Sequence, residues 1–283
     1  MSNLQFGLSS YSYRWSIGYG SHHPAKPMNT YAFIEKAAYF GFSSVQICDN
    51  LPYNKLPVSD LQKLNDLAEK QAISIETGAR GSDPDYLQRM LGISSMVNSG
   101  LLRIVTEIDR GNPPNQITKE LDQVIADIKT VLPLAKSKGI RLAIENHATL
   151  SSQDLLYIIQ TIDDLDVGVC VDTMNSILLM EPPLETVQAL VPYTLTVHLK
   201  DFRIEKHPER FEIIGVALGE GSVDFSEVLR ILSGCSATPT MHVELYIERK
   251  EDDESTLAWE DECVRKSIRY LRALVGNGFH EMN

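Results

Sequence analysis

Short runs of apolar and β-branched residues recur along the whole chain. Most lie roughly 30 residues apart, which is the length of a strand, a helix and two loops. This spacing predicts strands at residues 4–9, 44–48, 73–77, 102–106, 142–146, 167–172, 195–199 and 240–245. A chain with eight such runs matches an eight-stranded barrel.

The segments between these runs show helical spacing and helix-end residues. In residues 118–138, apolar side chains recur on one helical face, and Pro133 within that segment predicts a kink or a break. Helices are also predicted at 31–39 and 60–71, and at starts marked by Asp83 with Pro84, Ser151, Pro182 with Pro183, Asp224 and Ser255.

Alternating strands and helices predict an α/β fold with a parallel sheet and right-handed crossovers. An open doubly wound sheet usually carries a glycine-rich phosphate loop after its first strand, but this position reads SSYSYRW. No linker-like composition interrupts the chain. We therefore expect a single (β/α)₈ TIM barrel, with residues 1–283 forming one catalytic domain.

The connection after the seventh strand, residues 201–222, is long for a loop in a compact domain. It has mixed charge and contains Gly215, Gly219 and Gly221. Loops of this length are more often functional than accidental, although a surface excursion is the alternative.

Composition restricts the class of partner. The 283 residues carry a formal net charge of -12, which disfavours binding to nucleic acid. The four cysteines are scattered, as expected for thiols in a reducing compartment rather than a disulfide framework. No signal peptide and no run of transmembrane length is evident, so we expect a cytoplasmic protein without membrane contact.

Acidic and imidazole side chains stand at the ends of the last four predicted strands. Chemistry in barrels of this class lies at the carboxyl ends of the strands, where Glu145, Asp172, His198 and Glu244 would converge. Three bare carboxylates at one point repel each other, and a divalent cation removes the conflict. Mn²⁺, Mg²⁺, Co²⁺ and Zn²⁺ all suit this set. The alternative is that each is an ordinary loop cap, salt-bridge partner or core histidine.

Other polar residues at the predicted barrel mouth are candidates for substrate contacts. Lys200 shares a strand face with His198 and could bind a carboxylate or phosphate, protonate an intermediate, or simply pair with a neighbouring carboxylate. Arg203 could act similarly from the following loop. Tyr11 could stack on a sugar or pack the top of the barrel. Glu76 and Glu107 are weaker candidates for contacts to substrate hydroxyls.

The strand motifs resemble the xylose-isomerase-like TIM barrel superfamily, the sugar phosphate isomerase and epimerase group, over essentially the whole chain. The motifs are IENHA, CVDTMNS, HLKDFR and HVELY, with GEGSVDF between the last two strands. The resemblance implies one divalent metal ion held by Glu145, Asp172, His198 and Glu244. It also implies that Glu145 and Glu244 exchange protons with the substrate. Lys200, from its own position on the predicted inward face, is a further catalytic candidate.

The resemblance implies an isomerase or epimerase that acts on a small keto sugar or sugar acid through a metal-bound enediolate. The expected substrate contacts are His147, Asn175, Arg203, Tyr11 and Tyr246. A possible homo-oligomer is also expected.

Two departures argue against an ordinary ketose 3-epimerase. Asn175 and Ser151 stand where that group carries a histidine and a second glutamate. The alternative is a lyase built on the same intermediate, either a decarboxylase of a 3-keto sugar acid or a dehydratase. A non-catalytic sugar-binding barrel would not need two ligand carboxylates.

A DNA repair nuclease resembling endonuclease IV is the distant alternative. That relative needs three zinc ions and several more histidines. Asn175 replaces one expected ligand, and no DxH pair follows His198 at a suitable distance.

Overall fold

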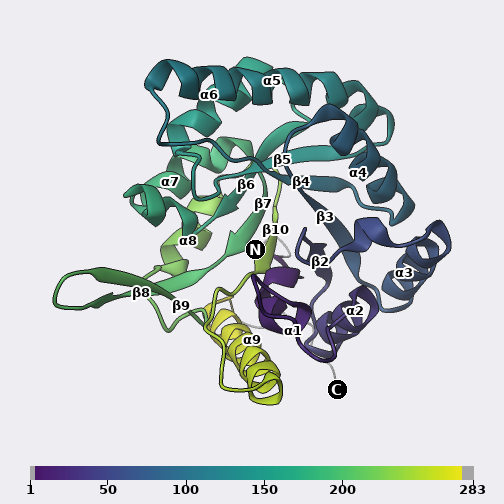
Figure 1. The fold of residues 1–283 in the computed structure, drawn as a ribbon, viewed down its shortest axis with the longest axis vertical. Helices are drawn as coiled ribbons and strands as arrows, with labels where there is room; N and C mark the ends of the chain where they lie inside the picture. Colours follow the sequence, from purple (N-terminus) through teal and green to yellow (C-terminus); the bar gives the residue numbers. More distant parts are fainter. Residues whose placement is uncertain (1–3, 276–283) are drawn as a thin grey trace.

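In the computed structural model, which describes residues 4–275, parallel strands close into a barrel surrounded by helices (Figure 1). Within this range the barrel has eight strands, in the order β1-β10-β7-β6-β5-β4-β3-β2. They are β1 (Gln5–Ser9), β2 (Ser44–Ile47), β3 (Ser74–Arg80), β4 (Leu101–Val105), β5 (Arg141–Glu145), β6 (Val167–Asp172), β7 (Thr194–Leu199) and β10 (Thr240–Val243). The predicted (β/α)₈ barrel is confirmed.

Helices follow the strands and cover the outside of the barrel (Figure 1). They are α1 (Arg14–Ile17), α2 (Thr30–Tyr39), α3 (Val58–Lys70), α4 (Pro84–Met96), α5 (Pro114–Ser137), α6 (Ser152–Ile162), α7 (Pro183–Leu190), α8 (Phe225–Leu232) and α9 (Asp253–Val275). Short 3₁₀ segments occur at η1 (Ser10–Tyr13), η2 (Tyr53–Lys55), η3 (Asn175–Leu179) and η4 (Val191–Tyr193).

Helix caps account for several of the predicted boundaries. Ser151 accepts from the backbone N–H of Asp154 in a capping box, and Asp224 accepts from the first turn of α8. α9 begins at Asp253, slightly before the predicted Ser255, because the Asp252 carboxylate accepts from the backbone N–H of Ser255.

The predicted break at Pro133 does not occur, because α5 continues through this residue as one helix. Its apolar stripe is buried on both sides of the proline, for example at Ile128, Val131 and Ala135. This burial offsets the roughly 3 kcal/mol that an interior proline costs a helix.

The connection between β7 and α8 is largely regular, which corrects the expectation of a long loop over residues 201–222. β8 (Asp201–Lys206) and β9 (Phe211–Val216) pair as an antiparallel hairpin that extends from the barrel (Figure 1). The base of the hairpin packs closely on the chain after β10. At Gly215 there is no room for a side chain, since a Cβ would lie 2.2 Å from the carbonyl oxygen of Tyr246.

Asp201 ties the hairpin to the segment that precedes α8. Its carboxylate accepts from the backbone N–H groups of Gly219 and Gly221, both at 2.9 Å, and of Val223 at 3.1 Å. This cluster of hydrogen bonds gives the aspartate of the HLKD motif a structural role.

The strand register brings the carboxyl ends of neighbouring strands to the same level. Asp172 on β6 is the partner of His198 on β7, which in turn faces His242 on β10. Side chains at the ends of β5, β6, β7 and β10 therefore open onto one end of the barrel.

Within residues 4–275, no helix is both long enough and apolar enough to cross a membrane. The prediction of one catalytic domain over residues 1–283 extends beyond the described range and stays a prediction.

Candidate metal centre

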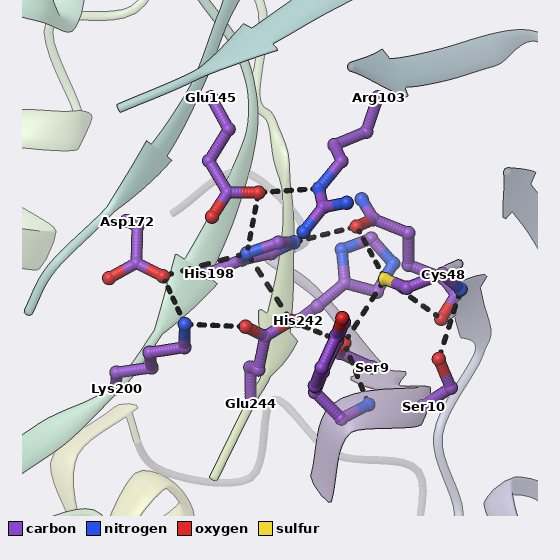
Figure 2. Close-up of polar contacts among 12 residues, drawn as sticks. Ser9, Ser10, Cys48, Arg103, Glu145, Asp172, His198, Lys200, His242 and Glu244 are labelled. Atoms are coloured by element: carbon purple, nitrogen blue, oxygen red, sulfur yellow. Dashed lines mark hydrogen bonds and ion pairs between the residues drawn. The ribbon is translucent and has the colours of Figure 1, made fainter. Parts of the chain in front are cut away.

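The four predicted ligands meet at the carboxyl end of the barrel. Glu145, Asp172 and His198 lie at the ends of β5, β6 and β7, and Glu244 follows β10 directly; all four are buried. One potential ligand atom from each lies within 4.8 Å of the others. Figure 2 shows the three carboxylates around the His198 ring.

The His198 ring is oriented with Nδ1 toward the acids. Nδ1 lies 3.6 Å from Glu145 Oε2, 3.6 Å from Asp172 Oδ2 and 3.3 Å from Glu244 Oε2. The other ring nitrogen, Nε2, lies 2.6 Å from Oε1 of the Gln46 side chain, which can only accept. Nε2 therefore carries a hydrogen.

These contacts test whether the residues fit a metal ion. Among the residues that the structure describes, Nδ1 of His198 is buried and has no hydrogen-bond partner. A bare nitrogen lone pair that faces three carboxylate oxygens is repelled unless a cation lies between them. The set of one imidazole and three carboxylates fits a divalent ion well.

A proton on His198 would also relieve the repulsion. Burial opposes a charge on the ring, but Cys170, Glu244 and Glu145 outweigh this effect and hold the pKa of His198 well above its usual range. A metal ion at this site would therefore have to displace a proton, so we expect its binding to be weaker at low pH.

Two buried cations contact the same carboxylates. Arg103 on β4 donates through Nε to Glu145, and its Nη1 lies 3.3 Å from Asp49 Oδ1. Lys200 Nζ lies 2.8 Å from Asp172 Oδ2 and 2.6 Å from Glu244 Oε1 (Figure 2). The ion pair considered for Lys200 is thus formed with two of the predicted ligands.

These cations determine the charge of Glu145. Burial alone would raise the pKa of this carboxyl, but the Arg103 guanidinium and His198 hold it well below its usual range. Glu145 is therefore ionised, and its ion pair with Arg103 makes it a poor acceptor for a proton from carbon.

Asp172 is held in place by the backbone around it. Its Oδ1 accepts from the N–H groups of Met174 at 2.8 Å and Asn175 at 2.9 Å, so Oδ2 faces His198. The Asn146 side chain brackets the strand end by donating to Asp172 O at 2.9 Å and accepting from Asp172 N at 2.6 Å. Asp172 is thus oriented for coordination before any ligand binds.

A cavity of about 640 Å³ opens beside this cluster. Most of the predicted substrate contacts line it. They are Tyr11, His147, Asn175 and Tyr246, together with the catalytic candidates Lys200 and Glu244. Asn175 also donates to Glu145 Oε1 at 3.0 Å, and burial lowers the pKa of His147.

Of three other candidates, Arg203 and Glu76 lie outside the cavity lining and Glu107 lies within it. Arg203 is outside the described cavity lining, on the exposed side of β8, where it donates to Glu205 at 2.9 Å. Glu76 lies deeper in the barrel, and Glu107 lines the cavity in an ion pair with Arg80.

Sequence reasoning missed Arg103, Asp49 and Gln46. Arg103 carried a usable signal, because it is a charged residue within the apolar run LLRIV of β4. Gln46 lies in the short strand SVQI and gave no comparable signal, since a lone amide in a strand is unremarkable.

The fold and the site together define a parallel (β/α)₈ barrel with an acid and imidazole cluster at the carboxyl ends of its strands. Residues 34–274 match the model of the family described as xylose isomerase-like TIM barrel. The chain belongs to this family.

Individual relatives cover nearly the full chain. The 3-oxo-isoapionate decarboxylase of Pectobacterium atrosepticum is 26% identical over 270 residues, which is 95% of this chain and 95% of that protein. A crystal structure of D-psicose 3-epimerase in the presence of D-fructose is 16% identical, with a TM-score of 0.72, and covers 97% of this chain and 100% of its own.

A second crystal structure, of the IolI protein with a binding zinc atom, is 14% identical, with a TM-score of 0.74. It covers 99% of this chain and 100% of its own. At these identities, the two structures establish the shared fold.

Proposed function

We propose that this chain is a divalent-metal-dependent enzyme that decarboxylates a small 3-oxo sugar acid. The observation that carries the proposal is the pairing of buried cations with the site's carboxylates: Arg103 with Glu145, and Lys200 with Asp172 and Glu244. The full-length similarity to 3-oxo-isoapionate decarboxylase supports the same reaction class.

The ion pair between Arg103 and Glu145 favours a lyase over an epimerase. Epimerisation needs a base on one face of the substrate and an acid on the other. Glu145 is tied to a guanidinium that is 1% exposed, so it suits a permanently charged ligand better than a proton carrier. Loss of CO₂ needs no base, because the electron pair comes from a carbon–carbon bond.

The reaction balances with one proton. The bond between the carboxylate carbon and C2 breaks, and its electron pair forms a C2–C3 double bond while the C3 carbonyl becomes an enolate oxygen. CO₂ leaves, and a proton then adds to C2 to give a hydroxy ketone. A divalent ion held by the quartet of Glu145, Asp172, His198 and Glu244 would act as a Lewis acid that stabilises the negative charge on the enolate oxygen.

The residues around the cavity divide the remaining work. Lys200 holds a proton beside the substrate space, between Asp172 and Glu244, and is the proposed donor to C2. Tyr11, Asn175 and Tyr246 present hydroxyl and amide groups that would orient the sugar hydroxyls.

Isomerisation or epimerisation is the second candidate. It is favoured by the presence of two glutamates, Glu145 and Glu244, in one ligand cluster. This reaction also passes through an enediolate, but it breaks a carbon–hydrogen bond and releases no CO₂.

A three-metal nuclease has less support. Among residues 4–275, the metal-ligand groups gather at one place, where both groupings share Glu145 and His198. A site for three ions would need further ligands around it.

Isotope labelling separates the two main reactions. Metal-loaded protein is incubated in D₂O with 3-oxo sugar acids labelled with ¹³C at the carboxylate, including 3-oxo-isoapionate, and in parallel with free ketoses. We expect ¹³CO₂ and a product with one deuterium at the former C2. Deuterium exchange into a ketose without CO₂ release would contradict the proposal and support the second candidate.

A further inference from the structure

A second layer of polar side chains lies in the barrel beneath the metal quartet. Gln46 on β2, Thr196 on β7 and His242 on β10 are fully buried, and Glu76 on β3 has a side chain that is 12% exposed. These four residues lie outside the described lining of the cavity, so they are not placed to contact a substrate.

The orientation of the Gln46 amide follows from its neighbours. Its Nε2 lies 3.0 Å from Glu76 Oε2, and the same carboxylate oxygen accepts from the Thr196 hydroxyl at 2.8 Å. Because Glu76 Oε2 is the acceptor in both contacts, the amide nitrogen of Gln46 faces Glu76. The amide oxygen is then left facing His198.

The amide in turn determines the tautomer of His198. Gln46 Oε1 lies 2.6 Å from His198 Nε2, and an amide oxygen cannot donate. The hydrogen on Nε2 is therefore fixed, and Nδ1, which faces Glu145, Asp172 and Glu244, is the nitrogen left to bind a metal ion (Figure 2).

We propose that Glu76 and Gln46 are positioning residues for the metal, acting through His198. Glu76 orients the Gln46 amide, and Gln46 holds the His198 ring so that Nδ1 alone is offered to the ion. Outer hydrogen bonds of this kind typically change metal affinity about 10- to 100-fold. The inference rests on the proposed metal site, but it does not depend on which reaction the enzyme catalyses.

The test measures zinc affinity without substrate. Chelator-treated protein is titrated calorimetrically with Zn²⁺. We expect Gln46→Met, which removes the acceptor, and Glu76→Gln, which lets the Gln46 amide invert, to bind zinc about 10- to 100-fold more weakly than the original chain. The hydrogen-bonded series Glu76–Gln46–His198 is called the relay. Ser44→Ala is the matched control, because Ser44 contacts His242 at 3.3 Å and is not part of the relay. It should bind zinc normally.

A swapped pair of substitutions distinguishes positioning from packing. In Gln46→Glu combined with Glu76→Gln, the new carboxylate accepts from His198 Nε2 and the new amide donates to that carboxylate. The relay is rebuilt with the same total charge, so zinc affinity should return to within about threefold of the original value. Glu76→Gln carries the test if Gln46→Met does not fold, because it preserves side-chain size.

Nuclear magnetic resonance of ¹⁵N-histidine-labelled, zinc-loaded protein supplies a structural signature. We expect the original chain to show hydrogen on Nε2 and zinc on Nδ1 of His198, and Glu76→Gln to show a mixture. Unchanged affinity and an unchanged tautomer in both single variants would overturn the proposal. If zinc binding follows the expected pattern but no decarboxylation is detected, the relay stands and the proposed function fails.

Discussion

Arg103 and Lys200 bring two positive charges into a ring of buried acids. Together, a bound divalent ion, the three ligand carboxylates, Arg103 and Lys200 would carry one net positive charge. We expect such a site to attract an anionic substrate. Burial alone would raise the pKa values of Glu145 and Asp172, but Arg103 and Lys200 respectively help to hold them below their usual range. We therefore expect the two cations to affect both stability and substrate choice.

Replacing Arg103 tests its stabilising role. Arg103→Met leaves Glu145 buried without its cation, which should lower the free energy of unfolding by about 3–5 kcal/mol in metal-free protein. Saturating zinc should recover part of this loss, because the ion takes over the charge of Glu145. Urea unfolding with and without zinc measures both values. The control Arg203→Met removes an exposed arginine and should change stability by less than about 0.5 kcal/mol.

Replacing Lys200 tests the proposed proton donor. Lys200→Met removes the ammonium while keeping much of the side-chain volume, and we expect kcat to fall about 10²- to 10⁴-fold. Zinc affinity should be kept or increased, because the ammonium no longer competes for Asp172 and Glu244. Lys206→Met, on the exposed end of β8, is the control. A Lys200→Met enzyme with unchanged kcat would contradict the assigned role.

At the scale of elements, one carboxylate joins the first residue of the β8–β9 hairpin to the segment that precedes α8. Asp201 accepts from four backbone N–H groups, of Phe202, Gly219, Gly221 and Val223. Gly221 has no room for a side chain, since a Cβ there would lie 2.2 Å from Asp201 Oδ1. The close approach to Asp201 thus explains why residue 221, the second glycine of the GEGS segment, has no side chain.

Removing this carboxylate should loosen the segment. Asp201→Ala leaves several backbone donors without their partner, so we expect a loss of about 2–3 kcal/mol in the free energy of unfolding. Urea denaturation measures it. Glu205→Ala, on the exposed part of the same strand, should change stability by less than about 0.5 kcal/mol. Equal effects of the two substitutions would show that Asp201 has no special role.

A buried carboxyl joins α9 to α1. Glu260 accepts from the backbone N–H groups of Trp15 at 2.9 Å and Ser16 at 3.2 Å. Burial raises the pKa of Glu260 to about 7, from an ordinary value of 4.5, even though these hydrogen bonds oppose the shift.

This shift predicts a pH dependence of stability. Between pH 4.5 and 7 the folded chain keeps a proton that the unfolded chain has lost, so stability falls as pH rises through this window, by roughly 3 kcal/mol in total. Glu260→Gln does not titrate and should remove this part of the slope. Urea unfolding at several pH values provides the comparison, and an identical slope in the variant would refute the assignment.

Some helices and strands could be predicted from the sequence and others could not. The alternation of apolar runs with helical segments was sufficient to predict the barrel, because each strand and helix buries one face locally. The hairpin was missed because its strands, FRIE and FEII, carry mixed charges outside a core. Of the kink or break predicted at Pro133, the break was wrong because local propensity yielded to burial along α5.

At the scale of the whole molecule, part of the site was predictable from the sequence and part was not. The quartet was predictable, because parallel strands of a barrel end at one level and bring strand-end residues together. The roles of Arg103 and Gln46 depend on contacts between strands distant in sequence, such as the 2.6 Å approach of Gln46 to His198 across the barrel. Single-strand patterns do not encode such pairings. Whether the four residues hold metal in solution stays a prediction.

The most direct test of this account is the number of metal ions bound per chain. Chelator-treated protein is titrated with Zn²⁺ or Mn²⁺ in a calorimeter, and the metal content of the dialysed product is measured. We predict one ion per chain for the original protein, with binding weaker at low pH, and at least a hundredfold lower affinity in His198→Ala and Asp172→Asn. No bound ion, three ions per chain, or unchanged affinity in both variants would contradict the assignment of Glu145, Asp172, His198 and Glu244 as ligands.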